Sequence, residues 1–269
     1  MWIDSFCKLC LVYSRTKDLI KLGREDKIPD LLVHLANIIK CSRSRSLAFA
    51  ESFNIIKSLV GSSDPYIEVK AMLNDIGRNL FCIVERYLEE REWNVKEAMR
   101  LSAAANIVDT SVLGYEVKSL EEALWDNPII EENIALPRDE EIYVVLDNAG
   151  EALVDMLLVK ALKINGYDVH IVVRKESYEI DVLKNDLGNV EALETPGNIS
   201  PLYHIRRGFI IAKGIANAEA YIEAGNTPSI HLLRAKCDVI AKAFNVVKNS
   251  TLIVSGNTLK EVLLRNPSY

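Results

Sequence analysis

Apolar residues recur along the chain in two different patterns, and the change between them falls near Pro137. In the first half they are spaced by three and four positions, which is typical of amphipathic helices. This spacing predicts helices over residues 31–39, 49–60, 64–90 and 94–107. The first half is therefore expected to be helical.

The second half contains short β-branched runs that alternate with helical stretches. Strands are predicted at residues 142–146, 169–173, 190–193, 209–212, 230–233 and 252–254, with a helix over 152–164. Such alternation is typical of a parallel sheet covered on both faces. The expected fold class is α/β, a Rossmann-like doubly wound and mostly parallel sheet (residues 136–269) with an N-terminal helical domain (residues 1–135).

Composition narrows the choice of partner and compartment. The chain has 269 residues, 49% of them apolar, and a net charge of −6, so a broad electrostatic surface for nucleic acid is not expected. The first residues, MWIDSFCKLC, lack the apolar core of a signal peptide, and no apolar run is long enough to span a membrane. Five irregularly spaced cysteines suit a reducing compartment. These features predict a cytoplasmic protein with a small-molecule partner and no membrane contact.

Polar residues gather where the predicted strands end. The segment VVLDNAGE, residues 144–151, carries a buried strand into Asp147 and Asn148, turns at Gly150 and enters a helix. Ligands of open α/β sheets bind beyond the carboxyl ends of the strands, so Asp147 is placed to meet one. On capping preference alone, it is equally plausible that Asp147 or Asn148 only caps the helix.

The later strands bring further polar side chains to the same rim of a parallel sheet. Arg174 and Asp181 follow one strand, and a second group follows another: Lys213, Gly214, Asn217 and Glu219. Carboxylate and amide oxygens suit Mg²⁺ or Mn²⁺, and a lysine beside such a metal suits a phosphate. The alternative without a function is that Lys213 and Glu219 are exposed, solvated side chains.

Other chemical candidates are weaker. Cys7 and Cys10 are three residues apart, so on a helix they share a face and could bind a soft metal, although a packed pair of reduced thiols is favoured. The four histidines are widely separated, and none is assigned a catalytic role. The Ser/Arg run at residues 41–46 is expected to be a solvated connection.

Several of these segments resemble the motif blocks of the damage-control phosphatase family, formerly called domain of unknown function 89. The blocks are LDNAGE at residues 146–151, VRKESYEID at 173–181, IAKGIANAEA at 211–220 and LLRAKC at 232–237. In the first half, the Cys7–Cys10 pair, DPYIEVK at 64–70 and AAANIVD at 103–109 resemble the archaeal-type helical region of that family.

The resemblance implies a metal-dependent phosphatase of sugar phosphates, phosphorylated cofactor precursors or damaged metabolites. Its metal ligands would be Asp147, Asn148 and Asp181, and the cation would be Mg²⁺, Mn²⁺, Co²⁺ or Ni²⁺. The family's helical-side and Lys-Gly blocks correspond to Asn106, Asp109, Lys213 and Gly214. Substrate contacts are expected from Asn106, Lys213 and Gly214, and also from the strand-end residues Arg174, Asn217 and Glu219. The chain departs from the family pattern at Ile180, where Asn is usual, and at Ala105, where Gly is usual.

The mechanism we expect is attack on phosphorus by a metal-activated water. Lys213 would neutralise charge on the phosphoryl oxygens, while Asp109 and Glu151 would orient the water or protonate the leaving oxygen. An aspartyl-phosphate route through Asp147 is less favoured, because phosphatases of that type carry a second Asp two residues on, where this chain has Ala149.

Two other functions stay open at this stage. One is an S-adenosylmethionine-dependent carboxyl methyltransferase, although the turn after the first strand holds one glycine where nucleotide-binding turns hold several. The other is a metabolite-binding protein without catalytic activity, because fold does not dictate function. Metal dependence would separate the phosphatase from the methyltransferase, and turnover of an aryl phosphate that is lost in Asp147→Ala would separate it from the binding protein. The physiological substrate and the oligomeric state stay open.

Overall fold

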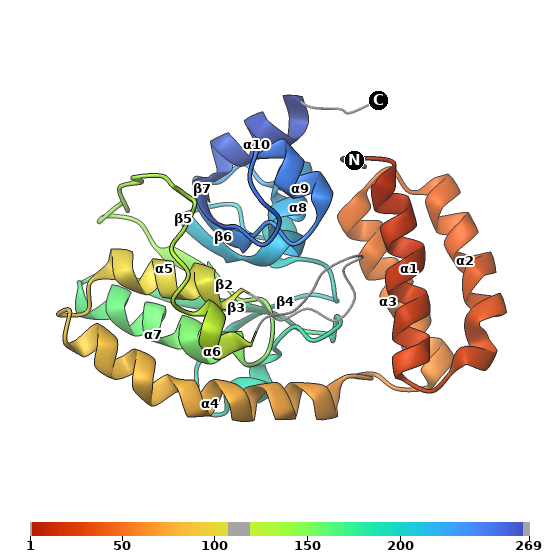
Figure 1. The fold of residues 1–269 in the computed structure, drawn as a ribbon, viewed down its shortest axis with the longest axis horizontal. Coiled ribbons are helices and arrows are strands. Elements are labelled where there is room, and N and C mark those ends of the chain that lie inside the picture. Colours follow the sequence, from red (N-terminus) through yellow and green to blue (C-terminus); the bar gives the residue numbers. More distant parts are fainter. Residues whose placement is uncertain (1, 107–118, 266–269) are drawn as a thin grey trace.

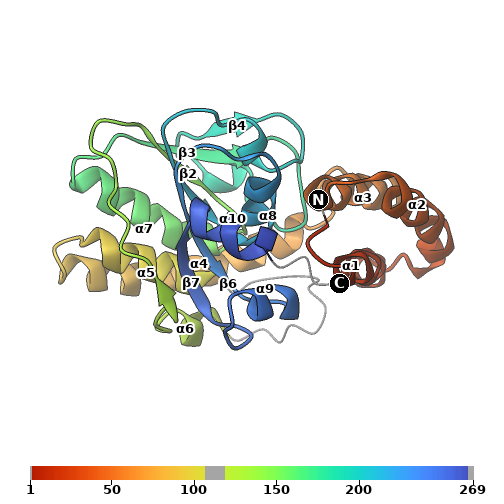
Figure 2. The ribbon, with the colours of Figure 1, turned by 90° about the horizontal axis from the view of Figure 1, so that it is seen from above.

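The computed structural model describes residues 2–106 and 119–265, and it contains a helical lobe beside an α/β body (Figure 1). The helical lobe consists of α1 (Phe6–Lys21), α2 (Ile28–Cys41) and α3 (Arg45–Val60). Figure 2, turned by 90°, shows the same three helices grouped at one end of the molecule. The long α4 (Ile67–Glu89) leads from this lobe along the body.

The body is built on a seven-stranded sheet in the order β1-β7-β6-β5-β2-β3-β4. Its strands are β1 (Ile130–Glu131), β2 (Ile142–Val145), β3 (Val169–Arg174), β4 (Leu193–Thr195), β5 (Phe209–Lys213), β6 (Ser229–Arg234) and β7 (Thr251–Ser255). All neighbours pair in parallel except β6 and β7. Since β2 lies between β3 and β5, the chain reverses its winding direction there, which opens a crevice at the carboxyl ends of β2 and β5.

Alternate residues of the strands face two separate hydrophobic cores. Val144 and Ile211 pack under α4, α5 (Val95–Ala105) and α7 (Glu151–Ile164), with short α6 (Leu120–Ala123) nearby. Val145 and Ile210 face the other core, which α8 (Gly214–Ala224), α9 (Asp238–Ala243) and α10 (Gly256–Arg265) cover. Burial on both faces explains why these strands are apolar at nearly every position.

The predicted α/β class and mostly parallel sheet are confirmed. The strand predicted at residues 190–193 is misplaced, because Gly188 takes a positive φ of 64° after a short 3₁₀ helix and pairing with β3 begins only at Leu193. Helix α1 was not predicted as an element. The division at residues 135 and 136 stays a prediction, and we note that α4 and α5 pack on α7 of the body. No described helix combines the length and apolar character needed to cross a membrane.

His231, to which no catalytic role was assigned, is fully buried in β6 beside Tyr221. Burial lowers the pKa of His231 to about 3, so the folded protein keeps it neutral where the unfolded chain protonates it near pH 6.5. The unfolded state therefore binds more protons between these values, and stability falls as the pH drops. From pH 7 to pH 5 this contributes a loss of about 2 kcal/mol.

Urea unfolding of the wild type and of His231→Gln at both pH values checks this expectation. Other titrating groups act in both proteins, so the wild type should lose about 2 kcal/mol more than the variant. Equal losses would show that His231 does not titrate in this way.

Candidate functional site

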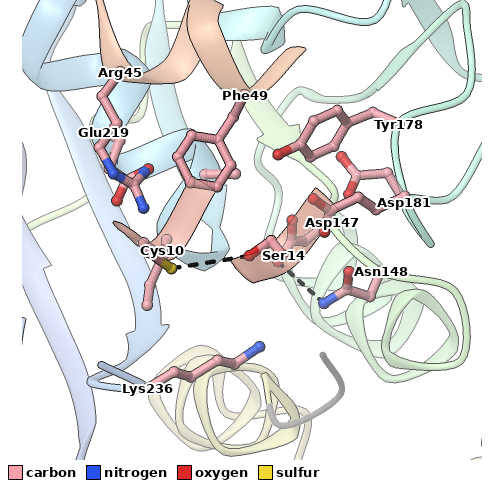
Figure 3. Close-up of a pocket in the computed structure, with 13 residues that line it drawn as sticks. Cys10, Ser14, Arg45, Phe49, Asp147, Asn148, Tyr178, Asp181, Glu219 and Lys236 are labelled. Atoms are coloured by element: carbon pink, nitrogen blue, oxygen red, sulfur yellow. Dashed lines mark hydrogen bonds and ion pairs between the residues drawn. The ribbon is translucent and has the colours of Figure 1, made fainter. Parts of the chain in front are cut away.

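A pocket lies between the helical lobe and the carboxyl ends of the central strands, and its volume is about 70 Å³. Asp147, Asn148 and Asp181 form one side, and residues of α1 and α3 such as Ser14 and Phe49 reach it from the lobe (Figure 3). Sites for drug-sized ligands are several times larger, at roughly 300–1,000 Å³. The pocket therefore suits a small ligand.

Backbone pairing brings the two motif segments of this pocket together. Asn148 and Asp181 form an isolated antiparallel bridge. Val182 N–H donates to the Asp147 carbonyl at 2.8 Å, and Ala149 N–H donates to the Ile180 carbonyl at 2.9 Å. Residues 31 to 35 positions apart in the chain are thus held side by side at the rim of the sheet.

Amide groups surround the Asp147 carboxylate. Its Oδ2 accepts from the side-chain amides of Asn106 at 3.1 Å and Asn148 at 3.3 Å. The same two amides also donate to Glu151, at 2.9 Å and 3.1 Å. Asn106, which ends α5, therefore links two buried carboxyl groups and fixes their positions.

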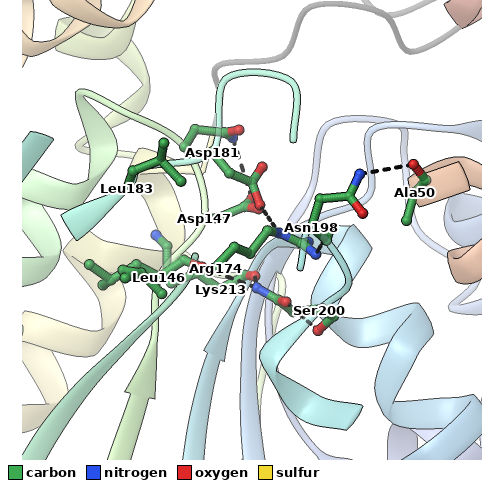
Figure 4. A network of polar contacts seen from close by, with 12 residues as sticks. Ala50, Leu146, Asp147, Arg174, Asp181, Leu183, Asn198, Ser200 and Lys213 are labelled. Atoms are coloured by element: carbon green, nitrogen blue, oxygen red, sulfur yellow. Dashed lines mark hydrogen bonds and ion pairs between the residues drawn. The ribbon is translucent and has the colours of Figure 1, made fainter. Parts of the chain in front are cut away.

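Asp181 is held by an arginine of the sheet that is itself linked to the helical lobe. Arg174, at the end of β3, donates through Nε to Asp181 and through Nη1 to the Asn198 carbonyl at 2.8 Å (Figure 4). Asn198 in turn donates to the Ala50 carbonyl of α3 at 2.9 Å. Arg174 thus positions Asp181 and ties it to the lobe through Asn198.

Ile180, where the chain departs from the family pattern, is buried in the hydrophobic cluster of the helical lobe. Tyr178 of the same segment packs there against Phe53. Glu179 forms an ion pair with buried Arg15 of α1. This apolar and ionic anchoring sets the position of the adjacent Asp181.

The carboxyl groups at and beside the pocket are buried, and the positive charges around them do not fully compensate for that burial. Burial raises the pKa of Asp147 to about 7, and the neighbouring Glu151 adds to the shift. Burial also raises the pKa of Asp181 to about 7, against the opposing effect of Arg174. The pKa of Glu151 is raised for the same reason, with Lys236 and Lys213 opposing. A site of this kind favours an added cation.

Gly214, the first residue of α8, lies against the Asp147 carboxylate. Its φ is +78°, and a Cβ at this position would overlap Asp147 Oδ2. The glycine after Lys213 is therefore needed both for the turn from β5 into α8 and for the close approach to Asp147. The sequence-based expectation that Gly214 contacts substrate stays a prediction.

Lys213 does not line this pocket. Its ammonium group is fully buried, donates to the Ser102 carbonyl and forms an ion pair with Asp155 at 3.1 Å. Asp155 also accepts from the Ser102 hydroxyl at 2.6 Å. This geometry corrects the expected role of Lys213 at the phosphoryl oxygens. Its ammonium group is paired with Asp155 and does not reach the pocket.

Among the described residues, Lys236 is the lysine that lines the pocket, and the sequence-based predictions did not include it. It is 2% exposed and lies close enough to lower the pKa values of Asp147 and Glu151. The signal is present in the sequence, since Lys236 belongs to the LLRAKC block and follows the end of a predicted strand.

The other predicted residues take different positions. Asn217 donates to the carbonyls of Leu146 and Lys213 and accepts from Ser200, so it braces the ends of β2 and β5. Glu219 lines the pocket and pairs with Arg45. Asp109 lies outside the described residues.

Arg45 and Phe49 of α3 were also missed. The Ser/Arg run was expected to be solvated, yet Arg45 is 8% exposed and Ser46 donates its hydroxyl to Glu223 of α8. The reason is that this run begins α3 on the side of the helical lobe that contacts α8 of the body. Nothing local in the sequence indicates that contact.

Two further clusters lie apart from the paired motif segments. Glu141, Asp168 and His170 could together hold an ion, but they lie at the amino-terminal ends of β2 and β3, the opposite edge of the sheet. Cys7 and Cys10 are buried free thiols on α1, and Cys10 reaches the pocket wall.

Comparisons with known proteins identify the family of this chain. The family model described as damage-control phosphatase ARMT1-like domain matches residues 13–200. A damage-control phosphatase of Pyrococcus horikoshii is 28% identical over 242 residues, which is 80% of this chain and 81% of that protein. A damage-control phosphatase of Archaeoglobus fulgidus is 26% identical over 218 residues, 71% of this chain and 75% of that one.

The fold has a solved counterpart. A crystal structure of a protein of the domain-of-unknown-function-89 family from P. horikoshii superposes with a TM-score of 0.74 and 20% identity, and the match covers 94% of this chain and 98% of that one. The family model itself spans well over half of the chain. The chain therefore belongs to the damage-control phosphatase family with an ARMT1-like domain.

Proposed function

We propose that this protein is a divalent-metal-dependent phosphatase that hydrolyses small phosphorylated metabolites. The observation that carries the proposal is the bridge between residues 148 and 181, which joins three oxygen-bearing side chains at one rim of the sheet. Two archaeal relatives are named damage-control phosphatases, which supports the reaction class.

The residues present fit a hard divalent cation. Asp147, Asn148 and Asp181 offer oxygen ligands, and no His or Cys stands within these motif segments. The raised pKa values of Asp147 and Asp181 indicate that buried carboxylates there lack compensating charge. When bound, the cation would supply Lewis acidity and a water of lowered pKa. Mg²⁺, Mn²⁺, Co²⁺ and Ni²⁺ all remain candidates.

The chain's own residues bind and orient the phosphoryl group. Lys236 lines the pocket and would neutralise charge on the phosphoryl oxygens, the role that Lys213 cannot take from its place beside Asp155. Ile215 and Ala216 bring the first turn of α8 to the same pocket, and the N–H groups of a first helical turn favour anions.

A proton-handling role falls to Glu151. Burial raises its pKa above the ordinary value, and the side-chain amides of Asn106 and Asn148 hold it beside Asp147. In this position it is the candidate for orienting the water or protonating the leaving oxygen. Asp109, the other candidate from sequence, lies outside the described residues.

The small pocket volume favours the phosphatase over the methyltransferase, because S-adenosylmethionine has the size of a nucleotide. The test is to strip the protein of metal and assay a panel of phosphorylated metabolites with each of the four cations. We expect turnover that returns with at least one cation and is lost again with chelator. Activity that survives chelation, together with binding of S-adenosylmethionine, would refute the proposal.

A further inference from the structure

Arg45 closes the side of the pocket that faces the three proposed metal ligands. It is the first residue of α3, yet only 8% of it is exposed. Figure 3 shows Arg45 and Glu219 on one side and Asp147, Asn148 and Asp181 on the other, with the ring of Phe49 between the two groups. A ligand with its phosphoryl group at the carboxylates would extend toward Arg45.

The guanidinium of Arg45 is held rigidly by both parts of the molecule. It pairs with Glu219 of α8, and its central carbon lies 4.4 Å from the centre of the Phe49 ring. The backbone N–H of Arg45 donates to Glu223 at 2.7 Å, which fixes the start of α3 against α8. A planar, preorganised guanidinium loses little entropy when it binds a ligand.

One donor of this fixed group is unused. Arg45 Nε is buried and has no hydrogen-bond partner among the described residues. Buried donors are normally paired, because leaving one unmade costs free energy. Since Arg45 lines the pocket, a ligand oxygen can supply the missing acceptor.

The ion pair between Arg45 and Glu219 determines which kind of ligand group can supply that oxygen. Their opposite charges neutralise each other, and the Glu219 carboxylate would repel a second anionic group. A hydroxyl group suits both partners, because it can accept from Arg45 Nε and donate to a Glu219 oxygen.

We propose that Arg45 is a specificity-determining residue that selects phosphate monoesters with a hydroxylated leaving group. This inference rests on the proposed function. It adds that the helical lobe, through α3, recognises the part of the substrate remote from phosphorus.

The experiment compares two esters of equal chain length, glycerol 1-phosphate and propyl phosphate, with the metal-loaded wild type. The wild type should prefer glycerol 1-phosphate by about 10- to 100-fold in kcat/KM, as expected when a site built for a hydroxyl meets an analogue without one. This comparison needs no variant, so it stands even if a substitution perturbs folding.

Arg45→Lys then tests the residue itself, because lysine keeps the charge but has no Nε–H at that position. The variant should lose at least about tenfold more kcat/KM toward glycerol 1-phosphate than toward propyl phosphate, mainly through KM. Arg43→Lys, the same change at an exposed position two residues away, is the matched control and should keep the preference.

The outcomes separate the two proposals. Equal losses on both esters in Arg45→Lys, or a wild type that does not distinguish them, would overturn the role of Arg45 and leave the phosphatase intact. A wild type that hydrolyses neither ester nor any member of the metabolite panel with any of the four cations would overturn both.

Discussion

Asp147→Asn is expected to reduce phosphatase turnover by about 10³-fold, the upper end of the range seen when one preorganised catalytic group is removed. Asp147 is the residue on which the amides of Asn106 and Asn148 converge and against which Gly214 packs. The substitution removes a charged ligand without changing the size of the side chain. Assays of turnover and calorimetric titration with Mn²⁺ should show the loss of both activity and cation binding.

The same variant should fold at least as well as the wild type. Burial raises the pKa of Asp147, which means that the ionised carboxyl is unfavourable in the folded state, so removing it should leave the unfolding free energy unchanged or raise it by about 1 kcal/mol. Asp168→Asn is the matched control, because Asp168 is an exposed carboxylate at the opposite edge of the sheet. Full activity in Asp147→Asn would remove the basis of the metal site.

Local sequence patterns were sufficient to predict most of the strands in the α/β body. The runs at residues 142–146 and 230–233 became β2 and β6 with boundaries shifted by one residue, because strands buried on both faces must be apolar throughout. The strand predicted to begin at Val190 was misplaced for a non-local reason. Whether that stretch joins the sheet depends on where the chain leaves Gly188 and meets the edge of β3, and apolar periodicity carries no information on either.

Sequence order also predicted which residues would meet at the rim, since the carboxyl ends of parallel strands share one edge. It could not predict the direction of each side chain. Lys213 ends β5 next to Asp147 in space, yet its long chain turns toward Asp155 and Ser102 below the rim. That choice depends on a buried carboxyl in α7, four residues beyond Glu151, which no strand-end argument includes.

The contribution of the helical lobe was the least predictable part. Arg45 lies in a polar run that is typical of an exposed connection, and its burial follows from the docking of the lobe on α8. The contacts that produce this docking join residues more than 140 positions apart, such as Asn198 with Ala50. The side of the pocket wall that the helical lobe forms is therefore a property of tertiary structure alone.

Gly214→Ala is expected to impair activity almost as strongly as the loss of Asp147, by about 10²- to 10³-fold. Two effects combine at this position. A residue other than glycine at φ +78° costs about 1–2 kcal/mol, and the added Cβ would overlap the Asp147 carboxylate. The overlap can be relieved only if Asp147 or the start of α8 moves, and either movement disrupts the proposed metal site.

Gly61→Ala separates these two effects. Gly61 ends α3 with a φ of +77°, and nothing lies within 4 Å of a Cβ added there, so this variant carries the backbone cost without the overlap. We expect Gly61→Ala to lose about 1–2 kcal/mol of stability in urea unfolding and to retain its turnover. Gly214→Ala should lose more stability and nearly all turnover, and its affinity for Mn²⁺ should fall with the activity. Similar behaviour of the two variants would mean that the contact between Gly214 and Asp147 has no part in the site.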